Sequence, residues 1–129
     1  MLAQVAPRTI FVPRDKRYPF TQHRAFTVHG DSMNELGIRD GHIVYGVDFA
    51  SAGAALTNGM IVVVERERDG LLERSLKEVR LHRDHIEFRP RSSNPVHEPF
   101  TVPRRWAGGE FSPGYRVLAI VRSGYYSFE

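Results

Sequence analysis

Short apolar runs with the length and composition of β-strands recur along the chain. Residues 115–121 (YRVLAIV) are typical of a buried strand, and residues 60–64 (MIVVV) form a second β-branched run. Residues 42–47 (HIVYGV) and 85–89 (HIEFR) predict two more strands. Runs of this length, separated by turn residues, predict a mainly β fold of several short antiparallel strands with little helix.

One break in this pattern presents a serine. Phe26 and Val28 alternate with polar neighbours as in a strand, and the chain then turns at Gly30 and Asp31 and reaches Ser32. Gly30 is expected there because the turn needs a residue without a Cβ. A predicted strand follows as well, so two strands flank an exposed serine, which is where a fold would place a nucleophile.

The segment at residues 71–82 supports two predictions. Its apolar residues include a set at i, i+4 and i+7, which with several Glu, Arg and Lys residues favours an amphipathic helix. The pair Asp69 and Gly70 directly before it is a hairpin signal and favours a strand, which we predict. On a strand, Lys77 shares a face with Val79 and is expected to point toward the core.

The N-terminal part of the chain shows less pattern. Residues 1–8 have no periodicity and predict a frayed arm, whereas residues 9–12 (TIFV) predict a short first strand. Residues 14–24 predict an irregular connection whose aromatic side chains pack onto the domain. We therefore divide the chain into an N-terminal arm, residues 1–24, and one domain, residues 25–129.

Loops are predicted where small residues, proline and glycine gather. Residues 48–55 (DFASAGAA) predict a flexible loop, residues 90–98 a polar loop, and residues 99–114 an irregular stretch. Trp106, within the last of these, is expected to fold over the edge of its own domain rather than to anchor a partner. The aromatic residues of 124–128 close the final strand.

Composition narrows the classes of protein that fit. The 129 residues suffice for one core and include no cysteine, which excludes disulfides and fits a reducing, cytoplasmic setting. There is no apolar run of about 20 residues and no signal-peptide pattern, so we expect a soluble protein without membrane contact. The 18 basic and 15 acidic residues are interspersed, and no helix-turn-helix or zinc-finger pattern occurs. Any DNA contact is expected through a domain absent from this chain.

The six histidines suggest two alternative kinds of site, a catalytic triad and a metal site. His29 lies near Ser32, and His82 and His85 are three residues apart, so a Ser-His-Asp triad or a zinc site can be imagined. No HExxH spacing supports a metal, and no nucleophile-elbow pattern surrounds the serine. We therefore predict neither a metal nor a cofactor, and expect His29 to be a residue of the surface or of the rim of the site.

Several segments of the sequence resemble those of one known family. GDSM at residues 30–33 together with GIRDG at 37–41 resembles the serine signature of the LexA-like and UmuD-like self-cleaving repressors. The resemblance extends from about residue 12 to the end of the chain. It includes NGMIVVV at residues 58–64, RSLKEV at 74–79, PRSSNP at 90–95 and the closing strands at 116–128.

The resemblance implies a LexA/signal-peptidase-like β-sheet fold and a serine peptidase that works with a Ser-Lys dyad. Ser32 then corresponds to the nucleophile and Lys77 to the general base, with the backbone N–H groups of Asp31 and Ser32 as the oxyanion hole. Such a lysine must lose its charge before it can accept a proton, and burial among apolar side chains lowers a lysine pKa.

The resemblance also implies a biological setting. The family's C-terminal strands form a homodimer, its substrate is its own upstream segment, and a RecA-type filament can act as co-protease. The family cuts an Ala-Gly or Cys-Gly bond before the serine, and residues 1–30 contain none. Ala52-Gly53 and Ala107-Gly108 both lie downstream of the serine.

Four interpretations follow from this. The first is the C-terminal autoproteolytic and dimerisation domain, as a product or fragment, of a longer transcriptional repressor of the SOS (DNA-damage) type. The second is an UmuD-like accessory protein of translesion synthesis. The third is a catalytically silent dimerisation module. A signal-peptidase-type enzyme is the fourth, although that class normally needs a membrane anchor.

Overall fold

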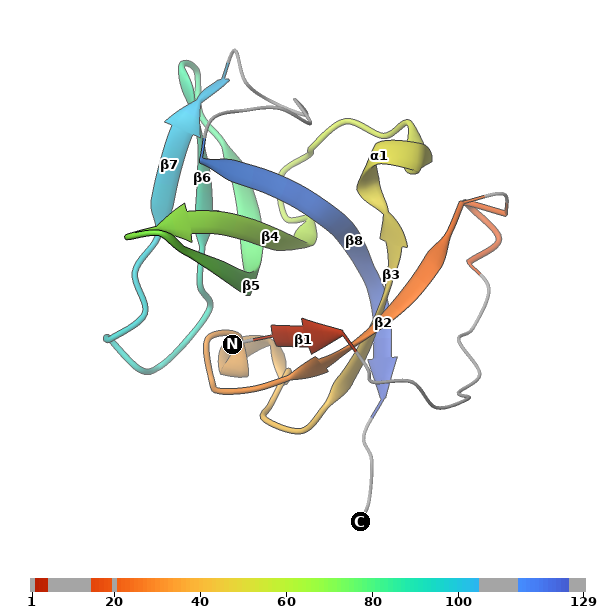
Figure 1. Ribbon diagram of the computed structural model, residues 1–129, viewed down its shortest axis with the longest axis horizontal. Coiled ribbons are helices and arrows are strands. Elements are labelled where there is room, and N and C mark those ends of the chain that lie inside the picture. The colour runs from red at the N-terminus through yellow and green to blue at the C-terminus, as the bar shows by residue number, and fades with distance from the viewer. Residues whose placement is uncertain (1, 5–14, 20, 105–113, 126–129) are drawn as a thin grey trace.

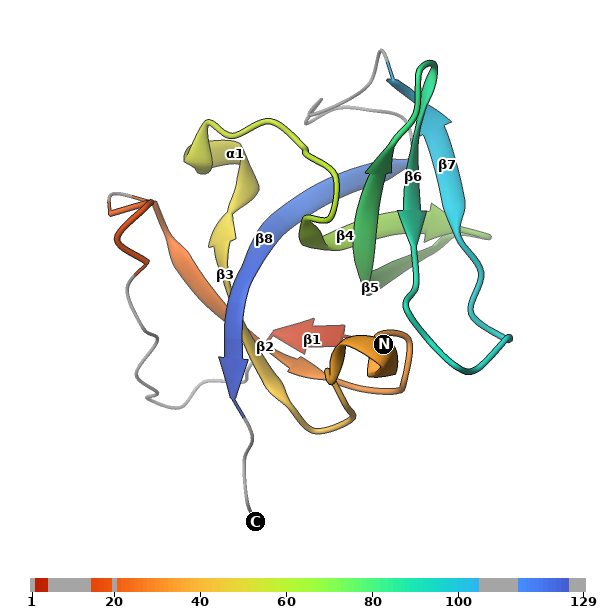
Figure 2. The same ribbon diagram turned by 180° about the vertical axis from the view of Figure 1, so that it is seen from behind.

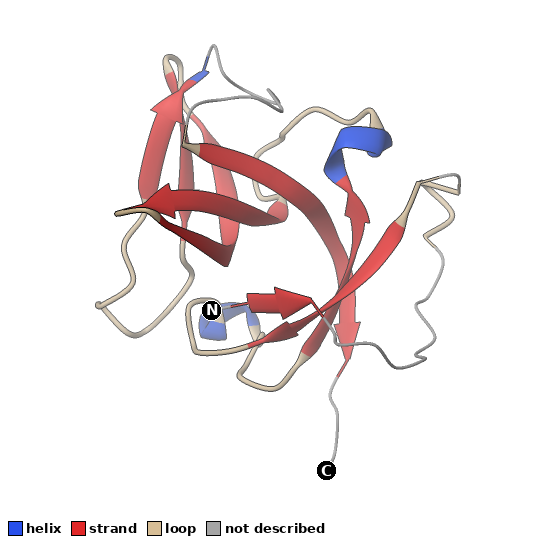
Figure 3. Ribbon diagram, viewed as in Figure 1, coloured by secondary structure: helices blue, strands red, loops and turns tan. Residues whose placement is uncertain are grey.

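The computed structural model describes residues 2–4, 15–19, 21–104 and 114–125, and strands dominate this part of the chain (Figure 3). Its strands form one antiparallel sheet in the order β1-β2-β3-β8-β4-β5-β6-β7 (Figure 1). The strands are β1 Leu2–Gln4, β2 His23–Val28, β3 Ile43–Asp48, β4 Ile61–Arg68, β5 Leu71–Leu81, β6 His85–Arg89, β7 Phe100–Pro103 and β8 Tyr115–Tyr125. The helical elements are α1 Phe49–Ala52 and the 3-10 helix η1 Asn34–Leu36. The prediction of a mainly β fold with little helix is confirmed.

The long strand β8 joins two parts of the sheet. It curves through the middle of the molecule, with β1, β2 and β3 toward one end and β4 to β7 toward the other (Figures 1 and 2). Most of its residues from Tyr115 to Ile120 are buried, as the apolar run YRVLAIV predicts. The last strand in sequence is therefore central in space.

Strand β4, which contains most of the apolar run at residues 60–64, is buried on both of its faces. Val62 and Val64 belong to one buried cluster of the core, whereas Val63 belongs to a second cluster on the opposite face. All three side chains are fully buried. A strand covered on both faces has no solvent-facing positions, so its sequence does not alternate.

The segment at residues 71–82 is a strand and not a helix. Asp69 and Gly70 both adopt positive φ, 52° and 77°, and form the predicted turn between β4 and β5. Residues along β5 then pair with β4 on one side and with β6 on the other. This pairing with two neighbours outweighs the local preference of Glu, Arg and Leu for helix.

Strands β3 and β8 approach closely at Gly46. A Cβ added to Gly46 would lie 2.9 Å from the carbonyl oxygen of Ile120, so a larger residue would push the two strands apart. The pairing of β3 with β8 also shifts register between Tyr45 and Gly46.

Three local predictions were wrong. Leu2–Gln4, expected in a frayed arm, forms strand β1 because it pairs with β2. Phe49–Ala52, expected in a loop, forms α1, in which the carboxylate of Asp48 accepts the N–H of Ser51 at 3.0 Å. Phe100–Pro103, expected to be irregular, forms β7 because it pairs with the edge of β6.

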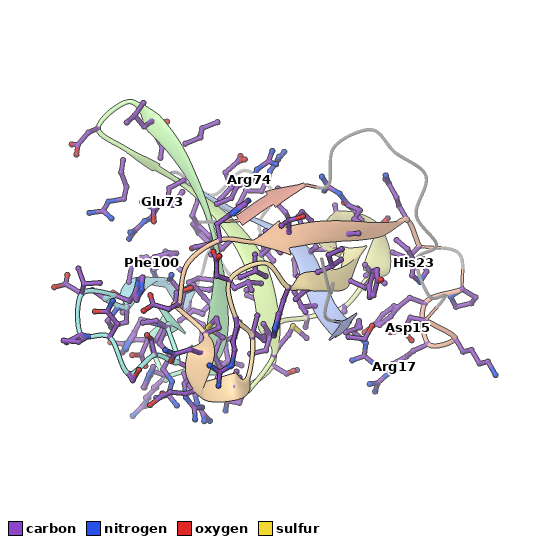
Figure 4. The ribbon with its side chains drawn as sticks, turned by 90° about the horizontal axis from the view of Figure 1, so that it is seen from below. Asp15, Arg17, His23, Glu73, Arg74 and Phe100 are labelled. Atoms are coloured by element: carbon purple, nitrogen blue, oxygen red, sulfur yellow. The ribbon has the colours of Figure 1, made fainter. Side chains whose placement is uncertain are left out.

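The segment before β2 is held at one end of the molecule. Figure 4 shows Asp15, Arg17 and His23 there, well apart from Phe100. The N–H of Asp15 donates to Nε2 of His23 at 2.9 Å, and Nε of Arg122 on β8 donates to the Asp15 carboxylate at 2.6 Å. Tyr18 packs against the core, as predicted for the aromatics of this connection.

Two further predictions, the strand at residues 9–12 and the placement of Trp106, lie outside the described residues. The division into an arm, residues 1–24, and a domain, residues 25–129, stays a prediction. None of the helices in the described part of the chain has the length and apolar character that crossing a membrane requires.

Candidate active site

The turn that carries Ser32 begins where β2 ends. Val28 still pairs across the sheet, since its N–H donates to the carbonyl of His42 at 2.8 Å. Gly30 then adopts φ 95°, a conformation that glycine reaches without strain. Its N–H donates to Oδ1 of Asp40 at 2.8 Å, so the turn is tied to the loop before β3. The expected reason for Gly30 is thereby confirmed.

The residue after the serine anchors the turn in the core. Met33 is 1% exposed and belongs to the same buried cluster as Leu76 of β5. Helix η1 follows and ends at Gly37, which adopts φ 77°. Ser32 itself is half-buried, so the prediction of a serine in a turn between two strands is confirmed but its full exposure is not.

The loop at residues 90–98, which we call the 90–98 loop, packs against the serine turn, residues 30–33. The N–H of Arg91 donates to the carbonyl of Ser32 at 2.9 Å, and the N–H of Glu35 donates to the carbonyl of Arg91 at 2.9 Å. The side chains of Asn34 and Ser93 are joined by a hydrogen bond of 3.1 Å. A segment about 60 residues further along the chain therefore fixes the backbone on both sides of Met33.

The same loop also holds Asp31. Its carboxylate accepts hydrogen bonds from Nε2 of His97 at 2.5 Å and from Nδ2 of Asn94 at 3.2 Å. The hydrogen bond from His97, and then that from Asn94, lowers the pKa of Asp31. The sequence does not predict this role of His97, because 66 residues separate it from Asp31 and no motif joins them. His29, the histidine expected at the surface or the rim of the site, is exposed.

Lys77 lies on β5 with a side chain that is almost fully buried, 6% exposed. Its partner across the sheet is Val62, which is fully buried. Burial lowers the pKa of Lys77, the charge of Arg66 lowers it further, and Glu73 opposes both. The prediction that Lys77 lies on a strand and faces the core is confirmed.

Glu78, the next residue, is a buried carboxylate surrounded by arginines. It is 5% exposed and lies 2.9 Å from Nη1 of Arg91, 3.1 Å from Nε of Arg89 and 3.3 Å from Nε of Arg80. Burial alone would raise the pKa of Glu78, but the hydrogen bond from Arg89 and the charges of Arg91 and Arg80 outweigh it and lower the pKa. Glu78 is thus a paired anion beside Lys77.

The neighbours of Ser32 and Lys77 meet in space. Met33 follows Ser32, Leu76 precedes Lys77, and both pack in one buried cluster. Arg91 also joins the two segments, because its N–H donates to the carbonyl of Ser32 and its side chain donates to Glu78, the residue after Lys77. The structure therefore packs the serine turn against the region of β5 that carries the lysine.

A family model for Peptidase S24-like proteins matches residues 3–110, which include the serine turn, the 90–98 loop and most of the sheet. This chain belongs to the Peptidase S24-like family. Among curated protein sequences, none matches it.

The S24-like family comprises the serine peptidases of LexA and UmuD type, so the resemblance seen in the sequence is confirmed and the chain is a peptidase domain of the self-cleaving kind. Within the described ranges, no group of three or more His, Asp or Glu side chains is arranged to hold a metal ion. In this S24-like domain, Arg91 and the cluster that contains Met33 and Leu76 join the serine turn to β5, and these contacts are not specified by the sequence motifs.

Proposed function

We propose that this S24-like domain cleaves a peptide bond of its own polypeptide with a Ser-Lys dyad, in which Ser32 is the nucleophile and Lys77 the general base. The buried amine of Lys77 carries this proposal, because burial lowers its pKa and a neutral amine is what a serine needs as its base. A solvated lysine would have stayed protonated at neutral pH.

The direction of Lys77 sets a condition on the pairing. Leu76 points into the cluster that contains Met33, and neighbouring residues of a strand point to opposite faces, so Lys77 points away from that cluster. The proposed dyad therefore requires that the Ser32 side chain also points away from the Met33 cluster, toward the lysine amine.

The chemistry then proceeds in two stages. Ser32 Oγ bonds to the carbonyl carbon of the scissile peptide while its proton passes to the Lys77 amine, and the ammonium returns that proton to the leaving nitrogen as the C–N bond breaks. Water next attacks the acyl-enzyme and gives a proton to the lysine. The proton returns to Ser32 Oγ as the ester bond breaks, which leaves a new carboxyl terminus and the free serine.

The backbone N–H groups of Asp31 and Ser32 are the proposed oxyanion donors. Among the described residues, neither N–H donates to a backbone carbonyl, whereas the surrounding turn is held by the Gly30 and Arg91 hydrogen bonds. Donors fixed before the reaction stabilise the developing charge without reorganising.

We further propose that the domain serves a LexA-type or phage-type transcriptional repressor. In this setting it would form a homodimer through its C-terminal strands, act in the cytoplasm, respond to a RecA-type filament and bind DNA through a separate domain. Family membership supports this role, since LexA-type peptidases are self-cleaving.

Self-cleavage of the full-length gene product tests the dyad. We expect a first-order rate that is independent of protein concentration and that rises between pH 7 and about pH 10 as the amine loses its proton. Ser32→Ala and Lys77→Ala should each abolish the rise. Product masses from both pH values would identify the scissile bond, and cleavage that survives Lys77→Ala would reject Lys77 as the base.

A further inference from the structure

Arg91 contacts both halves of the candidate site. We propose that Arg91 is a positioning residue that holds the serine turn against the lysine strand, so that the Ser32 hydroxyl stays within reach of the Lys77 amine. This inference rests on the proposed Ser-Lys chemistry for its effect on rate, but the contact itself can be tested without cleavage.

The backbone of Arg91 forms the first connection. Its N–H donates to the carbonyl of Ser32 and its carbonyl accepts the N–H of Glu35, both at 2.9 Å. One residue of the loop thus bonds two backbone groups that lie three residues apart on the other segment. They fix the backbone of the nucleophile relative to the segment that follows β6.

The side chain forms the second connection. Nη1 of Arg91 donates to Oε2 of Glu78 at 2.9 Å, and Glu78 is buried and directly follows Lys77 on β5. A bond between two charged groups that are mostly removed from water is stronger than an exposed ion pair. Nε of Arg91 also lies 3.6 Å from Oε1 of Glu35, on the other side of the serine turn.

Two other arginines share the carboxylate but not the serine turn. Arg89 pairs with Glu78 from within β6, and Arg80 approaches it from β5 itself. Both therefore bind Glu78 from within the sheet. Arg91 is the member of this trio that extends from the sheet to the turn.

A small displacement of the turn is expected to matter. A nucleophile and its base react when their atoms approach to about 3 Å, and a shift of about 1 Å can reduce a rate by roughly a hundredfold. Without its guanidinium, the 90–98 loop loses the hydrogen bond to Glu78 of β5, and the backbone bonds of residue 91 to the serine turn remain without that support. These backbone bonds should then open more often, and the serine turn can shift relative to the lysine.

Arg91→Ala, with Arg80→Ala as the matched control, tests this role. Each variant removes one arginine from Glu78, but only Arg91 also bonds the serine turn. We expect the first-order self-cleavage rate of the full-length protein to fall 30- to 300-fold in Arg91→Ala and less than threefold in Arg80→Ala, at similar melting temperatures. Arg91→Lys, which keeps the charge, should recover part of the rate.

Hydrogen exchange tests the positioning role of Arg91 separately from the proposed Ser-Lys dyad. In a Ser32→Ala background, where the chain stays intact, the amide of Arg91 reports its bond to the carbonyl of residue 32. It should exchange at least tenfold faster with Arg91→Ala than with Arg80→Ala. Equal exchange in the two variants, or equal rates of cleavage, would overturn the positioning role. Faster exchange in a protein whose Ser32 form never cleaves would reject the dyad and leave the connection standing.

Discussion

The two halves of the candidate site are built in opposite ways. Lys77 lies in the middle of a strand that is paired on both sides, and burial sets its chemistry. Ser32 lies in a half-buried turn that is held by the buried Met33 and by a few hydrogen bonds with Asp40 and with the 90–98 loop. Strand pairing is cooperative and hard to displace, whereas a turn moves when single contacts are lost.

The difference teaches which property each residue needs. The base needs a lowered pKa, which burial in the weakly polar interior of the sheet provides. A nucleophile must be placed and must also release its product, which a turn held by side-chain contacts permits. Substitutions at the lysine should therefore change stability together with chemistry, and those around the serine should change mainly the rate.

The largest effect is expected at Lys77. Lys77→Met should abolish self-cleavage, at least a thousandfold, and raise the stability at pH 7 by about 1–2 kcal/mol, because an apolar side chain suits this buried position better than an amine. Ser32→Ala is the control and should abolish cleavage with a stability change within about 0.5 kcal/mol. Chemical denaturation and cleavage rates measure both. If Lys77→Met instead lowers the stability, the buried amine does not destabilise the folded protein, and this prediction is wrong.

The stability gained by Lys77→Met should depend on pH, which tests whether burial lowers the pKa of the lysine. The pKa of Lys77 is lowered in the folded protein, so between that value and the ordinary lysine pKa of about 10.4 the unfolded chain binds more protons. Stability then rises with pH across this window in the parent protein. The advantage of Lys77→Met should accordingly shrink as the pH approaches about 10. A difference that stays constant from pH 6 to 10 would show that the pKa of the lysine is not lowered.

A smaller effect is expected from the backbone of the turn. Gly30→Ala places a Cβ at φ 95° and should cost about 1–2 kcal/mol, with a cleavage rate at least tenfold lower because the serine moves. Gly37→Ala is the control, since it carries similar strain at φ 77° on the far side of η1. If both variants slow cleavage equally, strain rather than serine placement explains the loss.

The smallest effect is expected at Asp31. The pKa of its carboxylate is lowered by His97 and Asn94, so its contribution to stability is present above about pH 4 and is lost as the pH falls through the lowered pKa. Asp31→Asn should therefore lower the melting temperature slightly at pH 6, and by less as the pH falls through the lowered pKa. Cleavage should slow by less than tenfold. Asp40→Asn, which alters the other carboxylate beside the turn, serves as the control.

The sequence predicted those parts of the site that depend on short-range signals. Gly30 marked the turn before Ser32, and the Asp69-Gly70 turn identified the lysine segment as a strand despite its helical spacing. It did not predict β1 or β7, because three or four residues at a sheet edge become a strand only when a neighbour offers free backbone groups. Nor did it predict the contact of His97 with Asp31, which depends on how two loops meet.

The amino-acid sequence by itself determined the strands away from the sheet edges, the turn and the two residue types on which the proposed chemistry depends, because turn preference and side-chain alternation act within a few neighbouring residues. Tertiary structure alone decided how completely Lys77 is removed from water, that Glu78 is surrounded by arginines and that Arg91 joins β5 to the serine turn. Burial and charge pairing are properties of packed neighbours, and those neighbours come from distant parts of the chain.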